Sequence, residues 1–243
     1  MRKYNHAMAQ QVYPPSVIVR VILDHFFKYR KLTLTTRGLS QESEVPVFTT
    51  DRVISDMEQF YYVRLDALRE NPRGTRDWVV ILVLSMEGKF SNHGPDMRKL
   101  LDGIEAERAT KEGRLDEVIV VAEEAFFGKK HVTDVIREFQ QKQPTGPDFD
   151  GTSAFFSAYP YYNFCLVVPE HKSVAVHRIM TPEEVASVLE SQRLARTDLA
   201  VIYTTDAPIV WNGAREGQVI EIKRDSQTAG SALCYRRVER GAI

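Results

Sequence analysis

Three residues near the end of the chain have the types and spacing that some metal-dependent nucleases use. Glu221 and Lys223 alternate along one stretch, and Asp206 precedes them. In such sites two carboxylates hold Mg²⁺ while the lysine helps to position the attacking water. A second set with the same Glu-x-Lys pattern comprises Asp77, Glu87 and Lys89. Glu-x-Lys is also the ordinary polar face of a half-exposed strand, so the pattern alone is weak evidence. We keep a magnesium-dependent nuclease as the alternative to the main interpretation given below.

The other residues that could react form no recognisable catalytic or metal-binding set. His171 and His177 lie six residues apart, outside the short spacings of metal ligands, and are expected to form hydrogen bonds at a domain edge or partner surface. Cys165 and Cys234 match no metal spacing and are expected to be small apolar core residues in a reducing compartment. The hydroxyls of Ser226 and Thr228 lie in a predicted turn, and no general base accompanies them at a fixed spacing. We therefore expect turn hydroxyls rather than nucleophiles. We expect no cofactor.

Composition limits the class of protein. The chain has 243 residues, 43% of them hydrophobic, which is enough for one large or two modest domains. A net charge of -1 gives no overall attraction to nucleic acid, but it does not exclude a local basic patch. No apolar run approaches the roughly 20 residues that span a bilayer. We therefore expect an intracellular protein without a membrane segment.

The N-terminal part is predicted to contain two helices and a strand before a βαβ unit. The predicted elements are a helix over 16–29 capped by Ser16, a strand over 31–36, and a helix from Thr49 or Thr50 to Asn71. The second helix rests on apolar residues at helical spacing: Ile54, Met57, Tyr61, Leu65 and Leu68.

The middle of the chain alternates between apolar runs and helical patterns. Residues 78–84 and 117–121 are almost wholly apolar, as expected of strands buried on both faces. A helix opening at Pro95 follows the first, and a helix carrying Val132 to Phe139 follows the second. Strands that alternate with helices predict an α/β arrangement of the βαβ type.

Residues 140–153 interrupt this rhythm with prolines, glycines and polar side chains, which predicts a linker. The aromatic residues at 155–164 lack interleaved basic residues, so packing at a domain seam is favoured over a base-stacking platform. Residues 163–168 are predicted to form a strand. The expected organisation is an arm over 1–15, an α/β domain over 16–140, a linker and aromatic seam over 141–163, and a C-terminal domain over 164–243.

The C-terminal part has a strong helix signal. Thr181 and Glu184 form a capping box, with Pro182 at the first helical position. Residues 219–223 and 232–235 are predicted to pair as antiparallel strands, with Gly217 and Gly230 permitting the bends.

A series of residues recurs at characteristic spacing through this domain: His171, Val174, His177, Thr181, Glu184, Arg193, Leu194, Asp206, Gly213, Gly217, Val219, Ile222, Arg224, Ser226, Thr228, Gly230, Tyr235 and Arg236. With these residues the domain resembles the assembly domain of the small fifth subunit shared by the eukaryotic nuclear RNA polymerases, a family that also has an archaeal counterpart. One segment departs from the family pattern, because 199–208 lacks a proline and two arginines that the family carries. In the N-terminal part the similarity to the family's jaw domain rests on element order alone.

The resemblance implies an α/β (α+β) fold, with a jaw-type N-terminal domain and a small α+β assembly domain. It implies a non-catalytic structural subunit of a DNA-directed RNA polymerase in the nucleus, or the nucleolus if specific to polymerase I. The expected partners are the largest subunit, other polymerase subunits and downstream DNA. The residues expected to bind the partner are His171, His177, Asp206, Gly217, Arg224, Ser226, Thr228, Gly230, Tyr235 and Arg236. Those expected beside DNA are Lys129, Lys130 and His131. A free-standing nucleic-acid-binding regulator is a third interpretation.

Overall fold

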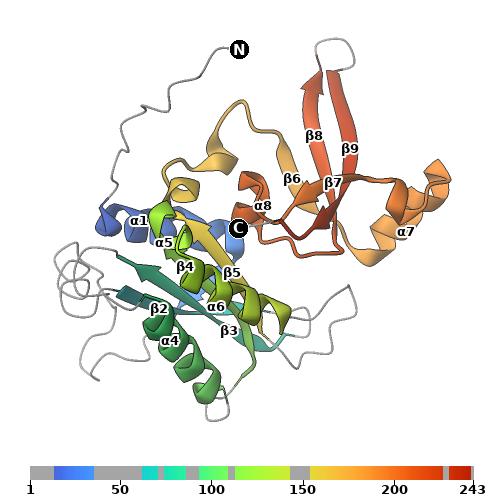
Figure 1. The fold of residues 1–243 in the computed structure, drawn as a ribbon. Coiled ribbons are helices and arrows are strands. Elements are labelled where there is room, and N and C mark those ends of the chain that lie inside the picture. The colour runs from blue at the N-terminus through green and yellow to red at the C-terminus, as the bar shows by residue number, and fades with distance from the viewer. Residues whose placement is uncertain are drawn as a thin grey trace, which may run out of the picture.

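The computed structural model describes residues 14–35, 62–70, 74–85, 93–108, 113–142, 154–226 and 230–241 (Figure 1). The elements that build the first sheet and its covering helices are α1 (Pro15–Val21), the π-helical turn η1 (Ile22–Phe26), α2 (Phe27–Arg30), β1 (Leu32–Leu34), β2 (Tyr62–Glu70), β3 (Arg76–Leu84), α4 (His93–Glu107), β4 (Leu115–Ala122), α5 (Glu124–Phe127), α6 (Lys130–Gln141) and β5 (Phe155–Pro160). The elements that follow are the 3-10 turns η2 (Tyr161–Phe164) and η3 (Val168–Glu170), β6 (Val176–Ile179), α7 (Pro182–Gln192), the 3-10 turn η4 (Arg196–Asp198), β7 (Ala200–Tyr203), α8 (Ala207–Asn212), β8 (Val219–Ser226) and β9 (Gly230–Glu239).

The first sheet has five strands in the order β1-β2-β3-β4-β5. Strands β3, β4 and β5 run parallel, while β1 and β2 join antiparallel at one edge. Helix α4 connects β3 to β4, and α6 lies between β4 and β5. The predicted buried strands, the helices after them and the α/β class are therefore confirmed.

Helices cover both faces of this sheet, which explains why its central strands are apolar throughout. Alternate residues of β3, from Trp78 to Leu84, pack under α4 and α6. The intervening residues Val79, Ile81 and Val83 pack under α1, η1 and α2.

Residues 62–70 form strand β2, so the helix predicted to reach Asn71 is wrong over this stretch. Val63, Leu65 and Ala67 are buried and alternate with less buried residues, which is the period of a strand. Leu65 and Leu68, whose spacing indicated a helix, lie on opposite faces of the strand: Leu65 packs on the α1 side and Leu68 on the α4 and α6 side. Strand β2 pairs with the apolar β3 over the whole length of β2, and this pairing stabilises a strand rather than a helix. The expected helix start at Thr49 or Thr50 lies outside the described residues.

Other boundaries also differ from the predictions. The first helix begins at Pro15, with Pro14 rather than Ser16 at the N-cap. Residues 155–160 form β5 and pair with β4, so this part of the expected seam belongs to the first sheet. Residues 163–168 form turns rather than a strand, because Asn163 and Phe164 are both buried while Leu166 is exposed. The domain boundaries themselves stay a prediction.

The second sheet has the order β6-β8-β9-β7, with β8 and β9 forming a long antiparallel hairpin. The hairpin extends away from the first sheet (Figure 1). Its base is covered on one face by α7 and on the other by α8. Thr181 and Glu184 form the predicted capping box of α7. Gly217 and Gly230 have φ of 84° and 71°, as expected of glycines at bends.

Helix α8 is shared between the apolar cores of the two sheets, because its Ile209 packs in the cluster of the second sheet. Val210 and Trp211 of α8 are fully buried in the cluster that covers the inner face of the first sheet. Trp211 packs edge-on against Phe26, and its indole N–H donates to the carbonyl of Asn163 at 3.0 Å. Among the described helices, none is long and apolar enough to span a membrane.

Candidate functional site

The second sheet brings four of the predicted partner-binding residues together. His177 of β6, Arg224 of β8 and Arg236 of β9 lie close enough for their charges to interact, and Asp206 precedes α8 beside them. Register places His177 opposite Ile222 and Arg224 opposite Ala232, so these side chains share the α8 side of the sheet. Arg224 is exposed at the free part of the hairpin.

His177 is the most perturbed titratable group of this cluster. Burial is the largest cause that lowers its pKa, and the charges of Arg224 and Arg236 lower it further. A hydrogen bond to the carbonyl of Ala175, at 2.6 Å, and the charge of Asp206 oppose the shift. The net direction of the pKa shift is downward, so the imidazole is held neutral between two arginines.

Two more of the predicted residues have clear structural roles. The N–H of Gly217 donates to the carbonyl of Val238 at 3.0 Å, and its carbonyl accepts from Arg196 at 2.6 Å, which fixes the bend before β8. Tyr235 faces the opposite side of the sheet, where it packs in the cluster under α7.

The remaining predicted residues lie at loops and turns. His171 sits in an exposed loop, where its ring accepts from the N–H of Ser173 at 3.2 Å. Gly230 pairs with Ser226 at the end of the hairpin, and Thr228 lies outside the described residues.

A row of exposed side chains that the sequence did not predict, two of them apolar and one cationic, lies across the sheet from the His177 cluster. Val176 pairs with Lys223, which pairs with Leu233, so the three side chains form a row on one face. Val176 is 69% exposed and Leu233 is 52% exposed. We use the name docking surface for six residues that lie on the two faces of β6, β8 and β9: Val176, His177, Lys223, Arg224, Leu233 and Arg236.

The residues of the alternative nuclease site take part in other interactions. Glu221 accepts from Arg178 at 3.1 Å, and Arg178 also binds Glu184 at 2.8 Å. A carboxylate oxygen of Asp206 accepts from the N–H of Tyr203 at 2.9 Å. No group of three His, Cys, Asp or Glu residues is placed to hold a metal ion within the described ranges. Of the second set, Glu87 and Lys89 lie outside the described residues.

The three residues predicted to lie beside DNA are at the start of α6. Lys129 is the N-cap, and Lys130 and His131 are exposed in the first turn. The backbone of His131 lies against Gly94 of α4, where an added Cβ would approach the His131 carbonyl oxygen to 2.9 Å. At its other end α6 contacts the domain of the second sheet, because the carbonyl of Gln140 accepts from Arg240 at 3.1 Å.

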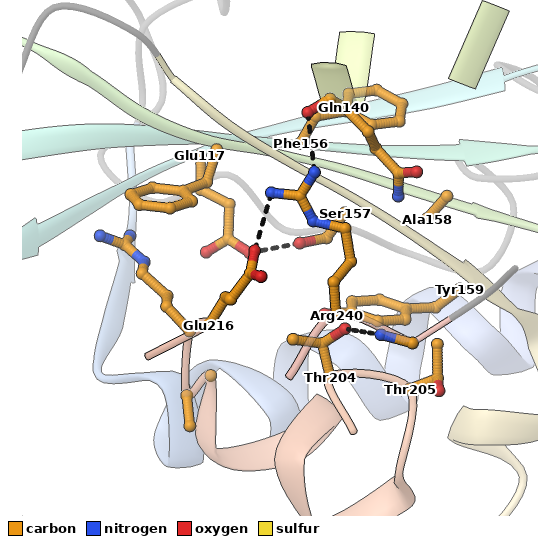
Figure 2. Close-up of a pocket in the computed structure, with 15 residues that line it drawn as sticks. Glu117, Gln140, Phe156, Ser157, Ala158, Tyr159, Thr204, Thr205, Glu216 and Arg240 are labelled. Carbon is orange, nitrogen blue, oxygen red and sulfur yellow. Dashed lines mark hydrogen bonds and ion pairs between the residues drawn. The ribbon is translucent and has the colours of Figure 1, made fainter. Parts of the chain in front are cut away.

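A buried charge network joins the two sheets, and the sequence did not predict it. Five charged residues take part: Arg30, Arg69, Asp116, Glu117 and Arg215. Figure 2 shows Glu117 in the narrow cavity between the first sheet and the loops of the second, with Ser157 donating to it at 3.0 Å. The available signal was the pair Asp116 and Glu117 inside an otherwise apolar strand, because buried carboxylates require partners.

A family model matches the part of the chain that contains the second sheet. The model of the family described as RNA polymerase Rpb5, C-terminal domain, matches residues 166–238. This range begins just after η2 and runs through most of β9, and so includes both faces of the hairpin.

Relatives of two sizes are similar to the chain. The DNA-directed RNA polymerase RPB5 homolog of African swine fever virus is 29% identical over 218 residues, covering 90% of this chain and 94% of the relative. The DNA-directed RNA polymerase subunit Rpo5 of Nitrosopumilus maritimus is 37% identical over 73 residues, covering 30% of this chain and 88% of the relative. The Rpo5 subunit of Thermococcus kodakarensis is 42% identical over 69 residues, covering 28% of this chain and 84% of the relative. The family match and the identity to the archaeal subunits together show that the chain belongs to the Rpb5 family of RNA polymerase subunits.

Proposed function

We propose that this protein is a non-catalytic structural subunit of a DNA-directed RNA polymerase, and that its docking surface binds the largest subunit. The observation that carries the proposal is the hairpin of the second sheet. It lies almost wholly within the region that matches the family, and together with β6 it exposes Val176, Lys223 and Leu233 on one face and Arg224 on the other.

The chemistry of the docking surface suits a protein partner. Val176 and Leu233 are large apolar side chains in open solvent, and burying them would contribute to binding. Arg224 and Arg236 supply charge on the other face, where a carboxylate of the partner could accept two parallel hydrogen bonds. An acidic and apolar groove of the largest subunit would complement both faces.

The N-terminal domain is proposed to form part of the jaw around downstream DNA. Lys130 is exposed in the first turn of α6, at the opposite end from Gln140. Ten residues of helix separate the two positions by about 15 Å, so the basic end points away from the domain contact. Cations beside the N–H groups of a helix start suit a phosphate. The proposed location is the nucleus, and this part of the proposal rests on the resemblance to the subunit of the eukaryotic nuclear RNA polymerases.

The test is coexpression of the full chain with the largest subunit, followed by affinity recovery. Arg224→Ala/Leu233→Ala should reduce recovery of the complex at least about tenfold, since two interface anchors are lost together. Arg137→Ala is the matched control, because Arg137 is an exposed arginine on α6 whose ion pair, to Asp134 at 3.2 Å, is local to that helix. Equal recovery of the double variant and the control would contradict docking through this hairpin.

A further inference from the structure

The joint between the two domains is centred on one buried arginine. The Arg30 side chain is 2% exposed. Its Nε donates to the carbonyl of Val210 in α8 at 3.0 Å, and its Nη1 donates to both oxygens of Glu117 at 3.1 and 3.2 Å. Its Nη2 donates to the hydroxyl of Tyr159 at 3.3 Å. One guanidinium therefore contacts helix α8 of the second domain and two strands of the first sheet.

Gly213 leaves the space that this arginine occupies. It ends α8 with φ of 78°, a conformation that favours glycine. A Cβ at Gly213 would also lie 2.5 Å from Nη1 of Arg30, which is closer than real contacts allow. Arg30 ends α2, which packs on the first sheet, whereas Gly213 ends α8 in the second domain. Any rotation of one domain relative to the other therefore changes this contact.

Arg215 makes a second connection a short distance away. Its Nη2 donates to Asp116 at 2.7 Å, and its guanidinium stacks on the ring of Phe155 at 3.8 Å. Arg69 then ties the network together, because it donates to Asp116 and to Glu117 at 3.1 Å. Two points of attachment resist twisting in a way that one point cannot.

The charges are strongly coupled. Burial opposes ionisation of Glu117, yet Arg30, Arg69 and Arg215 outweigh it and lower the pKa of Glu117 to about 2. The same pairing raises the pKa of Arg30 against the effect of burial. Arg30 and Glu117 are therefore both charged at neutral pH, although both are buried.

Buried ion pairs of this kind add little net stability, because desolvation offsets most of their attraction. Apolar packing, in contrast, stabilises without strict direction. The core around Trp211 can hold the domains together, but directed bonds are needed to select one angle between them.

We propose that the charge network of Arg30, Arg69, Asp116, Glu117 and Arg215 fixes the angle between the two domains rather than their stability. Arg30 and Arg215 are its positioning residues. The network is a property of the free chain. Its use, which is to hold the N-terminal domain at a set position relative to a bound polymerase, rests on the proposed function.

The test measures the distance distribution between spin labels on the full-length chain. Labels are attached at Asp102→Cys on α4 and Ala186→Cys on α7, two exposed positions, with Cys165 and Cys234 changed to alanine. Arg30→Met/Glu117→Leu removes both fully buried charges together. We expect its distribution to broaden about twofold or more, as for domains without a fixed interface, while its melting temperature stays within about 4 °C of the parent.

A milder variant covers the case in which the double variant does not fold. Arg215→Ala removes a partly exposed arm of the network and should broaden the same distribution by a smaller factor. Arg64→Ala is the matched control, because Arg64 makes equally short ion pairs, to Asp66 and Glu107, inside the N-terminal domain. Unchanged distributions in the folded variants, or equal broadening in the control, would overturn the proposal.

Recovery with the largest subunit separates this proposal from the proposed function. The network lies away from the docking surface, so Arg215→Ala should be recovered with the largest subunit as well as the parent chain. If the parent chain is not recovered, the proposed function fails while the distance measurement still tests the network.

Discussion

At the scale of single residues, burial decides which charged groups define this molecule. Glu117 is fully buried and surrounded by arginines, whereas Arg224 is exposed on the hairpin. The first arrangement fixes geometry inside the chain, and the second leaves a cation available to a partner. His177 lies between these extremes, half-buried beside Arg224 and Arg236.

His177 predicts how stability depends on pH. Its pKa lies below the ordinary value of 6.5, so the unfolded chain binds more protons in this range. The stabilisation that neutral His177 contributes is complete above pH 6.5. It is lost as the pH falls from 6.5 towards the lower pKa of His177 in the folded state. Chemical denaturation between about pH 7.5 and 5.5 should show a decline that His177→Gln makes shallower. His171→Gln is the control, and an unchanged slope in His177→Gln would contradict the account.

The lowered pKa of Glu117 predicts a second loss of folding stability, at lower pH. Its pKa is lowered from 4.5 to about 2, so the stabilisation is complete above 4.5 and declines as the pH falls towards 2. Glu117→Gln should remove this part of the acid dependence while lowering stability at neutral pH. The measurement is urea denaturation from about pH 5 to about pH 2.5, and an equally steep acid loss in the variant would be inconsistent with a depressed pKa.

Two glycines of similar conformation provide a further test. Gly213 and Gly74 have φ of 78° and 75°, but an added Cβ at Gly74 meets no neighbouring heavy atom within 4 Å. Gly74→Ala should therefore cost about 1–2 kcal/mol in free energy of unfolding, the cost of the left-handed conformation. Gly213→Ala should cost about 3–5 kcal/mol more, because it forces Arg30 away from its buried partner. Equal losses, measured by denaturant unfolding, would show that Arg30 moves aside easily.

At the scale of elements, the sequence predicts best where one period dominates. The apolar strands β3 and β4, the helices after them and the capping box of α7 are all present as predicted. The helix predicted to reach Asn71 is wrong over residues 62–70, because Leu65 and Leu68 have helical spacing but lie on opposite faces of a strand that is covered on both sides. Pairing with β3, which no local pattern shows, decides the outcome.

Helix α8 is the element on which the shared core depends. Trp211 is fully buried between the two domains, and the chain has two tryptophans, so Trp78→Phe leaves Trp211 as the single emitter. We expect blue-shifted emission that resists quenching by acrylamide until the chain unfolds. Quenching as strong as that of free tryptophan in the folded protein would contradict the shared core.

At the scale of the whole molecule, two sheets and one exposed hairpin account for the proposed role. Four residues of the predicted site come together in the structure: His177, Asp206, Arg224 and Arg236. They could be predicted because the family resemblance identified them in the sequence. The apolar row of Val176 and Leu233 could not be predicted, because apolar residues in strands normally indicate a core. The charge network could not be predicted either, since Arg30 and Glu117 are 87 residues apart.

The most direct test of the central claim is affinity purification of the tagged full-length chain from its own cells, followed by mass spectrometry. We expect the largest subunit and the other large subunits of one DNA-directed RNA polymerase in stoichiometric amounts. The Arg224→Ala/Leu233→Ala variant should lose them while remaining folded. Recovery of the chain without any polymerase subunit, under conditions in which the polymerase itself stays intact, would contradict the account.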